Sequence, residues 1–237
     1  MKNVTIGIFM AAVICLLYSC SKTGIINGSG KIVSEYRPQA AFDFIQEDGS
    51  INVVVVADTA YSVIVQSDDN VLPYLQTDVD GNVLTIKFKR NFLIKGDQTT
   101  VYVHCPTLSG AGIDGSGSIT SNVSFSSQQV NLRVDGSGTM HLALTAAHVT
   151  AILSGSGDIT LEGVAQQYDA NVQGSGNIRA YDLIADNATA VINGSGNAFV
   201  YASGNLHATI NGSGNIYFKG HPTVVSSMNG SGRIYQQ

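Results

Sequence analysis

Val191-Ile192-Asn193-Gly194-Ser195-Gly196-Asn197-Ala198 is the stretch that decides the fold, because its central Gly-Ser-Gly recurs along the chain. The recurrences are 18 to 21 residues apart and begin at Gly115, Gly136, Gly155, Gly174, Gly194, Gly212 and Gly230. An eighth copy, Gly28-Ser29-Gly30, lies far upstream. Self-similarity at a fixed period of about 20 residues indicates a repeat architecture, in which neighbouring repeats bury a common core.

Apolar residues flank every Gly-Ser-Gly with a period of two, which is the pattern of a β-strand. Two residues before the first glycine stand Ile113, Val134, Leu153, Val172, Ile192, Ile210 and Met228. Two residues after the last glycine stand Ile119, Met140, Ile159, Ile178, Ala198, Ile216 and Ile234. Glycine permits a sharp turn at positive φ and a close approach of stacked backbones, so we expect each Gly-Ser-Gly to be a corner.

Asparagines adjoin several of the corners and predict ladders of side-chain hydrogen bonds between coils. They precede the last three corners as Asn193, Asn211 and Asn229, and they follow three corners as Asn177, Asn197 and Asn215.

These patterns predict an all-β protein in which residues 109–237 form a parallel, right-handed β-helix with about seven corner repeats. An antiparallel sandwich is the rival fold, but its turns would recur every 8 to 12 residues. Residues 31–108 lack the Gly-Ser-Gly repeat. We expect them to form a β block that shares the core and caps the solenoid. Its predicted strands are 41–46, 51–57, 61–67, 83–89 and 99–105, with a tight turn at 80–82 and a short helical turn at 70–75.

The N-terminus has the marks of an export signal: a positive Lys2, a short apolar core and small residues beyond it. Leu16-Leu17-Tyr18-Ser19-Cys20 resembles a lipobox, the cleavage site of bacterial lipoproteins. The resemblance implies a signal peptide over residues 1–19, a lipid on Cys20 and a tether over residues 20–30. The alternative is an ordinary secretory signal with an incidental cysteine.

The net charge and the number of cysteines exclude some kinds of partner and of site. The net charge of −5 argues against nucleic-acid binding, which needs a basic face. Cys15 lies in the predicted signal, so Cys105 alone remains, and the mature chain is expected to form neither an intramolecular disulfide nor a cysteine metal cluster. Cys105 follows a strand-like run, where a buried inert thiol is expected.

Several motifs together resemble a known family. They are Lys31-Ile-Val-Ser-Glu-Tyr-Arg-Pro38, Phe42-Asp43-Phe44, Asn70-Val71-Leu72-Pro73 and the Ile-Asn-Gly-Ser-Gly-Asn corners at Ile192 and Ile210. This combination is similar to the autotransporter-adhesin head family, also called the GIN domain. The resemblance spans nearly the whole mature chain and implies a β-helical fold and an extracytoplasmic location.

The sequence predicts no catalytic residue, no metal site and no cofactor. A serine repeated in every corner is a poor nucleophile candidate, because a hydrolase needs one activated serine with a base and an oxyanion hole. The five histidines show no metal-ligand spacing, and the carboxylates of the repeats are spread over several corners. An enzyme acting on polysaccharide is kept as a distant alternative.

One surface feature is a candidate site. Phe199, Tyr217 and Tyr235 stand three residues after their corners, while Tyr181 and Tyr201 stand five after theirs. Both offsets have odd parity against the inward aliphatic series, so these rings are expected to face outward on neighbouring coils. A contiguous aromatic patch indicates a binding face or an oligomer interface.

We therefore expect an exported outer-membrane lipoprotein, on the periplasmic side or at the cell surface, held to the membrane through its lipid. Its expected role is that of a non-catalytic, adhesin-like or ligand-binding module; the sequence does not identify the ligand, and a glycan or an envelope protein is a candidate partner. The alternative is an envelope scaffold that self-associates as a homo-oligomer.

Overall fold

The computed structural model describes residues 24–237, most of which lie in β-strands. The predicted signal segment 1–19 and Cys20 lie outside the described residues. Among the residues described, no helix is long and apolar enough to cross a membrane.

The strands fall into an N-terminal group and a long regular series. The first group is β1 Gly24–Asn27, β2 Ile32–Pro38, β3 Phe44–Gly49, β4 Asn52–Ala57, β5 Ser62–Asp68, the 3-10 helix η1 Leu72–Tyr74, β6 Leu75–Asp80, β7 Val83–Phe88, β8 Phe92–Lys95 and β9 Thr100–Cys105. The series is β10 Gly110–Gly115, β11 Ser118–Gly136, β12 Thr139–Gly155, β13 Asp158–Val172, β14 Asn177–Ile192, β15 Asn197–Tyr201, β16 Asn205–Ile210, β17 Ile216–Lys219, β18 Thr223–Met228 and β19 Ile234–Gln236.

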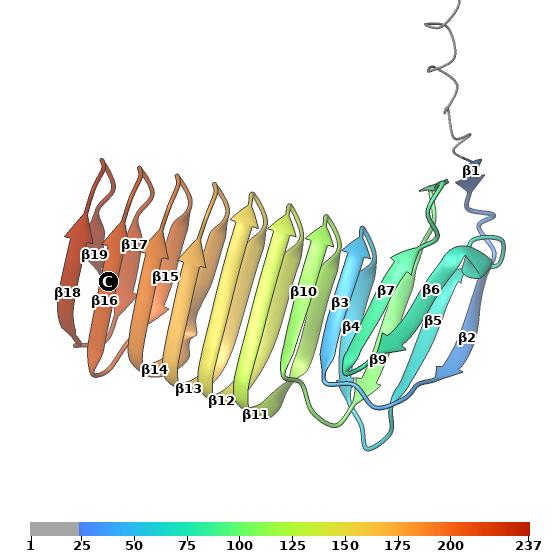
Figure 1. The fold of residues 1–237 in the computed structure, drawn as a ribbon, viewed down its shortest axis with the longest axis horizontal. Helices are drawn as coiled ribbons and strands as arrows, with labels where there is room; N and C mark the ends of the chain where they lie inside the picture. Colours follow the sequence, from blue (N-terminus) through green and yellow to red (C-terminus); the bar gives the residue numbers. More distant parts are fainter. Residues whose placement is uncertain (1–23) are drawn as a thin grey trace, which may run out of the picture.

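The series forms a parallel solenoid, as the repeat predicted (Figure 1). Each of β11 to β14 is one long strand that leaves a corner, bends midway and returns to the next corner, so a coil has two arms. In the later coils the two arms are separate strands, as in β15 and β16. Corner aligns with corner, since Gly115 pairs with Gly136 and Gly136 with Gly155.

The two arms of each coil enclose one core. The aliphatic columns that flank the corners are fully buried from Ile113 to Ile210 on one arm and from Ile119 to Ile216 on the other. The same buried cluster includes residues of the N-terminal group such as Ile45 and Val101. Burial in both regions therefore comes from one continuous core.

Close stacking is what requires glycine at the later corners. Positive φ occurs at Gly115, Gly136 and Gly155, but the first glycines of the four later corners lie outside that region. The expectation of positive φ at every corner is therefore wrong. An added Cβ at Gly194 would instead overlap the carbonyl oxygen of Gly174 in the preceding coil. That carbonyl accepts the backbone N–H groups of Ser195 and Gly196, both at 2.9 Å, so the coils approach to hydrogen-bond distance.

The predicted asparagine ladders are present on the outer side of the corners. Asn211 donates its Nδ2 to Oδ1 of Asn193 at 2.9 Å, and Asn229 donates to Asn211 at 3.1 Å. In the second ladder Asn197 donates to Asn177 at 2.9 Å. Each amide donates to the preceding coil, so each ladder runs in one direction.

The stack extends into the N-terminal group. β3 pairs in parallel with β10, and β4 pairs in parallel with β11. Gly49 is aligned with Gly115, so Gly49-Ser50 acts as a further corner that lacks the last glycine. The stacking of parallel strands therefore continues across residue 109, where the Gly-Ser-Gly repeat begins.

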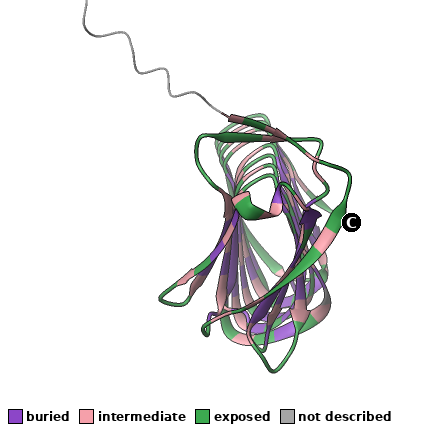
Figure 2. Ribbon diagram, turned by 90° about the vertical axis from the view of Figure 1, so that its right-hand side faces the viewer, coloured by how far each residue is buried: buried purple, intermediate pink, exposed green. Residues whose placement is uncertain are grey.

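The end of the stack beyond β3 and β4 is covered by a cap. β7 and β9 continue the parallel layers, and β6, β5 and β2 then add in antiparallel orientation. η1 lies across the opening between the two arms (Figure 2). Arg37 of β2 fastens the start of β6, which follows η1 directly, because its guanidinium donates to the backbone oxygen of Leu75 at 3.0 Å and to Oγ1 of Thr77 at 3.1 Å.

Candidate functional site

The predicted aromatic face exists as a stack of rings on the outer side of the last coils. Phe199, Tyr217 and Tyr235 are aligned by strand register. The ring centroids of Phe199 and Tyr217 are 4.9 Å apart with an interplanar angle of 8°, and those of Tyr217 and Tyr235 are 5.2 Å apart at 16°. Tyr181 meets Phe199 edge-on at 5.5 Å.

The rings stack on one another, so the faces between neighbouring rings are not open platforms. The Nζ of Lys219 covers the Tyr181 ring at 4.5 Å. Burial, and then the neighbouring Tyr217, raise the pKa of Tyr181. Tyr201 pairs with Lys219 in the strand register and stands beside the ring stack. The arrangement suits stabilisation of adjacent coils more than recognition of a flat ligand.

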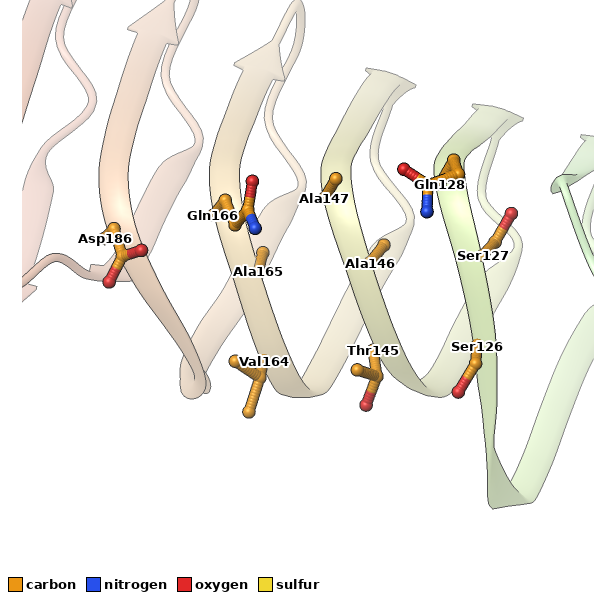
Figure 3. A pocket seen from close by; sticks show the side chains of 10 residues that line it. All are labelled: Ser126, Ser127, Gln128, Thr145, Ala146, Ala147, Val164, Ala165, Gln166 and Asp186. Carbon is orange, nitrogen blue, oxygen red and sulfur yellow. The ribbon is translucent and has the colours of Figure 1, made fainter.

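A second feature, which the sequence analysis did not identify, is a groove of about 660 Å³ along the bends of β11 to β14 (Figure 3). Three rows of side chains build it, each row contributed by successive coils. The floor is Ser127, Ala146 and Ala165, one rim is Ser126, Thr145 and Val164, and the other rim is Gln128, Ala147, Gln166 and Asp186.

Strand register explains why the rows are straight. Ser126 pairs with Thr145 and Thr145 with Val164, while Ser127 pairs with Ala146 and Ala146 with Ala165. Stacked strands are about 4.8 Å apart, so each row presents one side chain per coil at that interval. The floor stays low because its side chains are no larger than serine.

The groove is nearly uncharged and mixes polar side chains with apolar ones. Hydroxyls and amides can donate and accept hydrogen bonds, and Asp186 is the one carboxylate that lines it. Val164 is 53% exposed and adds methyl groups to the rim. Its neighbour in register, Ile184, is 43% exposed and extends the same row by one coil. An extended ligand lying along the stack would meet both kinds of contact.

The sequence does mark the floor of this groove, but by the small size of its side chains and not by one residue type. The residue nine positions before each of four successive corners is small: Ser127, Ala146, Ala165 and Ala185. The aromatic rows repeat one kind of residue at one offset from the corners, whereas the members of the groove rows differ in chemical type, so the groove rows are not apparent from the sequence.

Titratable groups outside the groove form separate surface pairs. Nε2 of His148 lies 2.7 Å from Asp169, Nδ1 of His104 lies 3.1 Å from Asp58, and Nε2 of His141 lies 3.4 Å from Glu162. No group of three potential metal ligands occurs within residues 24–237. Cys105 is buried, and burial raises the pKa of its thiol to about 12, which suits an inert core residue.

Comparison with known proteins gives a consistent result. The family model described as "Putative auto-transporter adhesin, head GIN domain" matches residues 41–222. A solved structure described as a putative adhesin, from Bacteroides fragilis NCTC 9343, is 25% identical with a TM-score of 0.86, and the match covers 90% of this chain and 100% of that one.

Two structures from Parabacteroides distasonis ATCC 8503 are also similar, each 27% identical over 90% of this chain. One, described as a putative adhesin, has a TM-score of 0.74 and is covered over 100% of its length. The other, described as a putative lipid binding protein, has a TM-score of 0.75 and is covered over 99%. No curated protein matches the chain.

Proposed function

This chain belongs to the auto-transporter adhesin head GIN domain family, and from that premise we propose that it is a non-catalytic binding module of the cell envelope. In this proposal it is exported, anchored in the outer membrane by a lipid on Cys20, and binds an extended uncharged glycan in the groove along β11 to β14.

The groove is the observation that carries the proposal. Its rows run along the stack, so the sites on successive coils repeat in one direction, as the units of a polysaccharide do. Gln128 and Gln166 offer amide donors and acceptors to hydroxyls, and Val164 offers methyl groups to the C–H faces of a sugar. The near absence of charge favours a neutral chain over an anionic one.

The same groove supports binding without turnover. Glycoside hydrolysis uses two carboxyl groups that flank the scissile bond, and among the described residues that line the groove only Asp186 is acidic. The three histidine–carboxylate pairs do not line it.

The anchor rests on the lipobox-like sequence, and the fold is compatible with it. The first described strand, β1, lies at the capped end of the solenoid, away from the groove (Figure 1). A lipid attached near that end would leave the bends of β11 to β14 open to ligands.

A glycan array probed with the purified chain tests the binding function. Ala147→Tyr places a large side chain in the gap between Gln128 and Gln166 and should abolish binding to any hit, whereas His207→Tyr, on an exposed site of β16, should not. Phospholipid vesicles serve as the comparison ligand. Binding to vesicles and to no glycan, or binding that survives Ala147→Tyr, would contradict the proposal.

A further inference from the structure

The last coil presents its core to solvent. Val224, Ser226 and Met228 of β18 are in register with Leu206, Ala208 and Ile210 of β16, which are buried core residues. Yet Val224 is 40% exposed and Met228 is 55% exposed, because among the described residues β16 is the one strand whose register with β18 is observed, and the other edge of β18 is left open. Together with Phe218, Ile234 and Tyr235, Val224 and Met228 line a pocket of about 610 Å³ at this end.

Edge strands of soluble proteins are usually protected by charged side chains, proline or bulges. β18 reads Thr-Val-Val-Ser-Ser-Met and contains none of these. From Thr223 to Gln237 the only charged side chain is that of Arg233. The opposite end of the stack is different, since η1 and the antiparallel strands β6, β5 and β2 cover it.

Two ladders also end at this face with one side unused. Tyr235 stacks on Tyr217 through one ring face and is 39% exposed. Asn229 donates its Nδ2 to Asn211, so its Oδ1 is the acceptor that a further layer would use. The face therefore offers an apolar centre, a strand edge, a ring face and a hydrogen-bond acceptor.

We propose that a second copy of this chain covers the face, in a tail-to-tail dimer in which β18 pairs antiparallel with β18 of its partner. A two-fold axis brings identical strand edges together in antiparallel orientation, so backbone hydrogen bonds can form and the two cores become continuous. Arg233, which also lines the pocket, is the one charged side chain from Thr223 to Gln237, so little charge opposes the contact of the face with its copy. Because the other end is capped, the association closes at two copies and does not propagate into a filament.

The dimer has a consequence for adhesion that rests on the anchor proposed above. Each copy has β1 at its capped end, far from β18 (Figure 1). In a tail-to-tail dimer the two capped ends, and with them the two anchors, point in opposite directions. This geometry suits contact between two membranes that each carry the protein.

Sedimentation of the purified mature chain tests the dimer, with two matched lysine variants. Ser226 is exposed in the single copy, so Ser226→Lys leaves the fold intact but places two ammonium groups in the dimer interface. His207→Lys is the control on an exposed, outward site of β16. The parent and His207→Lys should sediment as concentration-dependent dimers, and Ser226→Lys should sediment as a monomer with an unchanged melting temperature. A parent that stays monomeric, or a Ser226→Lys variant that dimerises equally, overturns the proposal.

Beads coated through the capped end extend the test to adhesion. Beads that carry the parent should cluster, and beads that carry Ser226→Lys should stay dispersed. The groove variant Ala147→Tyr should dimerise normally, so failure of glycan binding and failure of the dimer are read separately. Dimers in solution without bead clustering would overturn the opposed-membrane geometry alone.

Discussion

The carboxylate of Glu47 accepts a hydrogen bond from the backbone N–H of Ile51 at 2.9 Å, across the first corner of the stack. In later coils the corresponding N–H, such as that of Gly196, donates to a carbonyl of the preceding coil. The Gly49-Ser50 corner has β7 as its preceding layer, and β7 ends at Phe88 without a matching corner. Glu47 therefore supplies the acceptor, although it occupies a core position in register with Ile113.

This placement predicts a pH-dependent stability. Burial raises the pKa of Glu47 from 4.5 to about 7, and the charges of Asp48 and Asp114 add to the increase. The folded state thus favours the protonated acid, and the stability that it contributes is present at low pH and lost as pH rises through about 7. We expect the free energy of unfolding to decrease by up to about 3 kcal/mol over this range. Denaturant titrations of the parent and of Glu47→Gln at several pH values measure it; an equal slope in both proteins would refute the assignment.

The stacking account of the corners predicts that size, not φ, limits substitution at Gly196. An added Cβ there would overlap the carbonyl oxygen of Gly176, so Gly196→Ala must separate two coils. We expect a loss of about 3 kcal/mol or more, in the range of severe backbone and packing changes. Ser195→Ala, at the exposed centre of the same corner, should cost no more than about 1 kcal/mol. Equal melting temperatures for the two variants would remove the close-approach explanation.

The ring stack predicts a structural role for Tyr217. Its ring lies between those of Phe199 and Tyr235, and each such pair contributes about 0.5 to 1.5 kcal/mol beyond buried area. Tyr217→Ala should therefore destabilise the chain by about 1 to 3 kcal/mol. Tyr201→Ala, beside the stack, should cost clearly less. Thermal melts of the two variants measure the two losses of stability. A Tyr217→Ala variant as stable as the parent would show that the ring stack does not stabilise the fold.

The regular part of the fold was predictable because the same physical constraint recurs in every coil. Each corner needs glycine for close approach, and each flank needs an aliphatic side chain, so Gly194 and Ile192 repeat visibly. Parity also placed Tyr217 outward correctly, as its intermediate exposure shows. It could not show that the ring would be covered by its neighbours, because stacking depends on side-chain angles.

The cap and the groove were harder to predict, each for its own reason. β2 and β6 were missed because their side chains are largely polar or only partly buried, so no clear alternation marks them. Met228 has the correct inward parity but remains exposed, since parity says nothing about whether another layer follows. The groove was missed because Ser126 and Val164 share a position without sharing a chemical type.

The anchor is tested by Cys20→Ala. Loss of the thiol removes the acceptor of the lipid, so the variant should move from the detergent-extracted membrane fraction to the soluble periplasmic fraction. Fractionation followed by immunoblotting measures the shift, and Cys105→Ala serves as the matched control because its thiol is buried. A Cys20→Ala variant that stays with the membrane as strongly as the parent would contradict lipid attachment at this residue.

The central claim is that one glycan chain lies along the bends of β11 to β14. Calorimetric titration with a series of oligomers of the best array hit, from one sugar unit upward, tests it most directly. Successive coils are about 4.8 Å apart, so the groove is about 14 Å long and holds only a few units. The affinity should rise with each added unit until the groove is filled and then level off, and Ala147→Tyr should remove the rise. An affinity that does not depend on length, or that rises equally in Ala147→Tyr, would contradict binding along the groove.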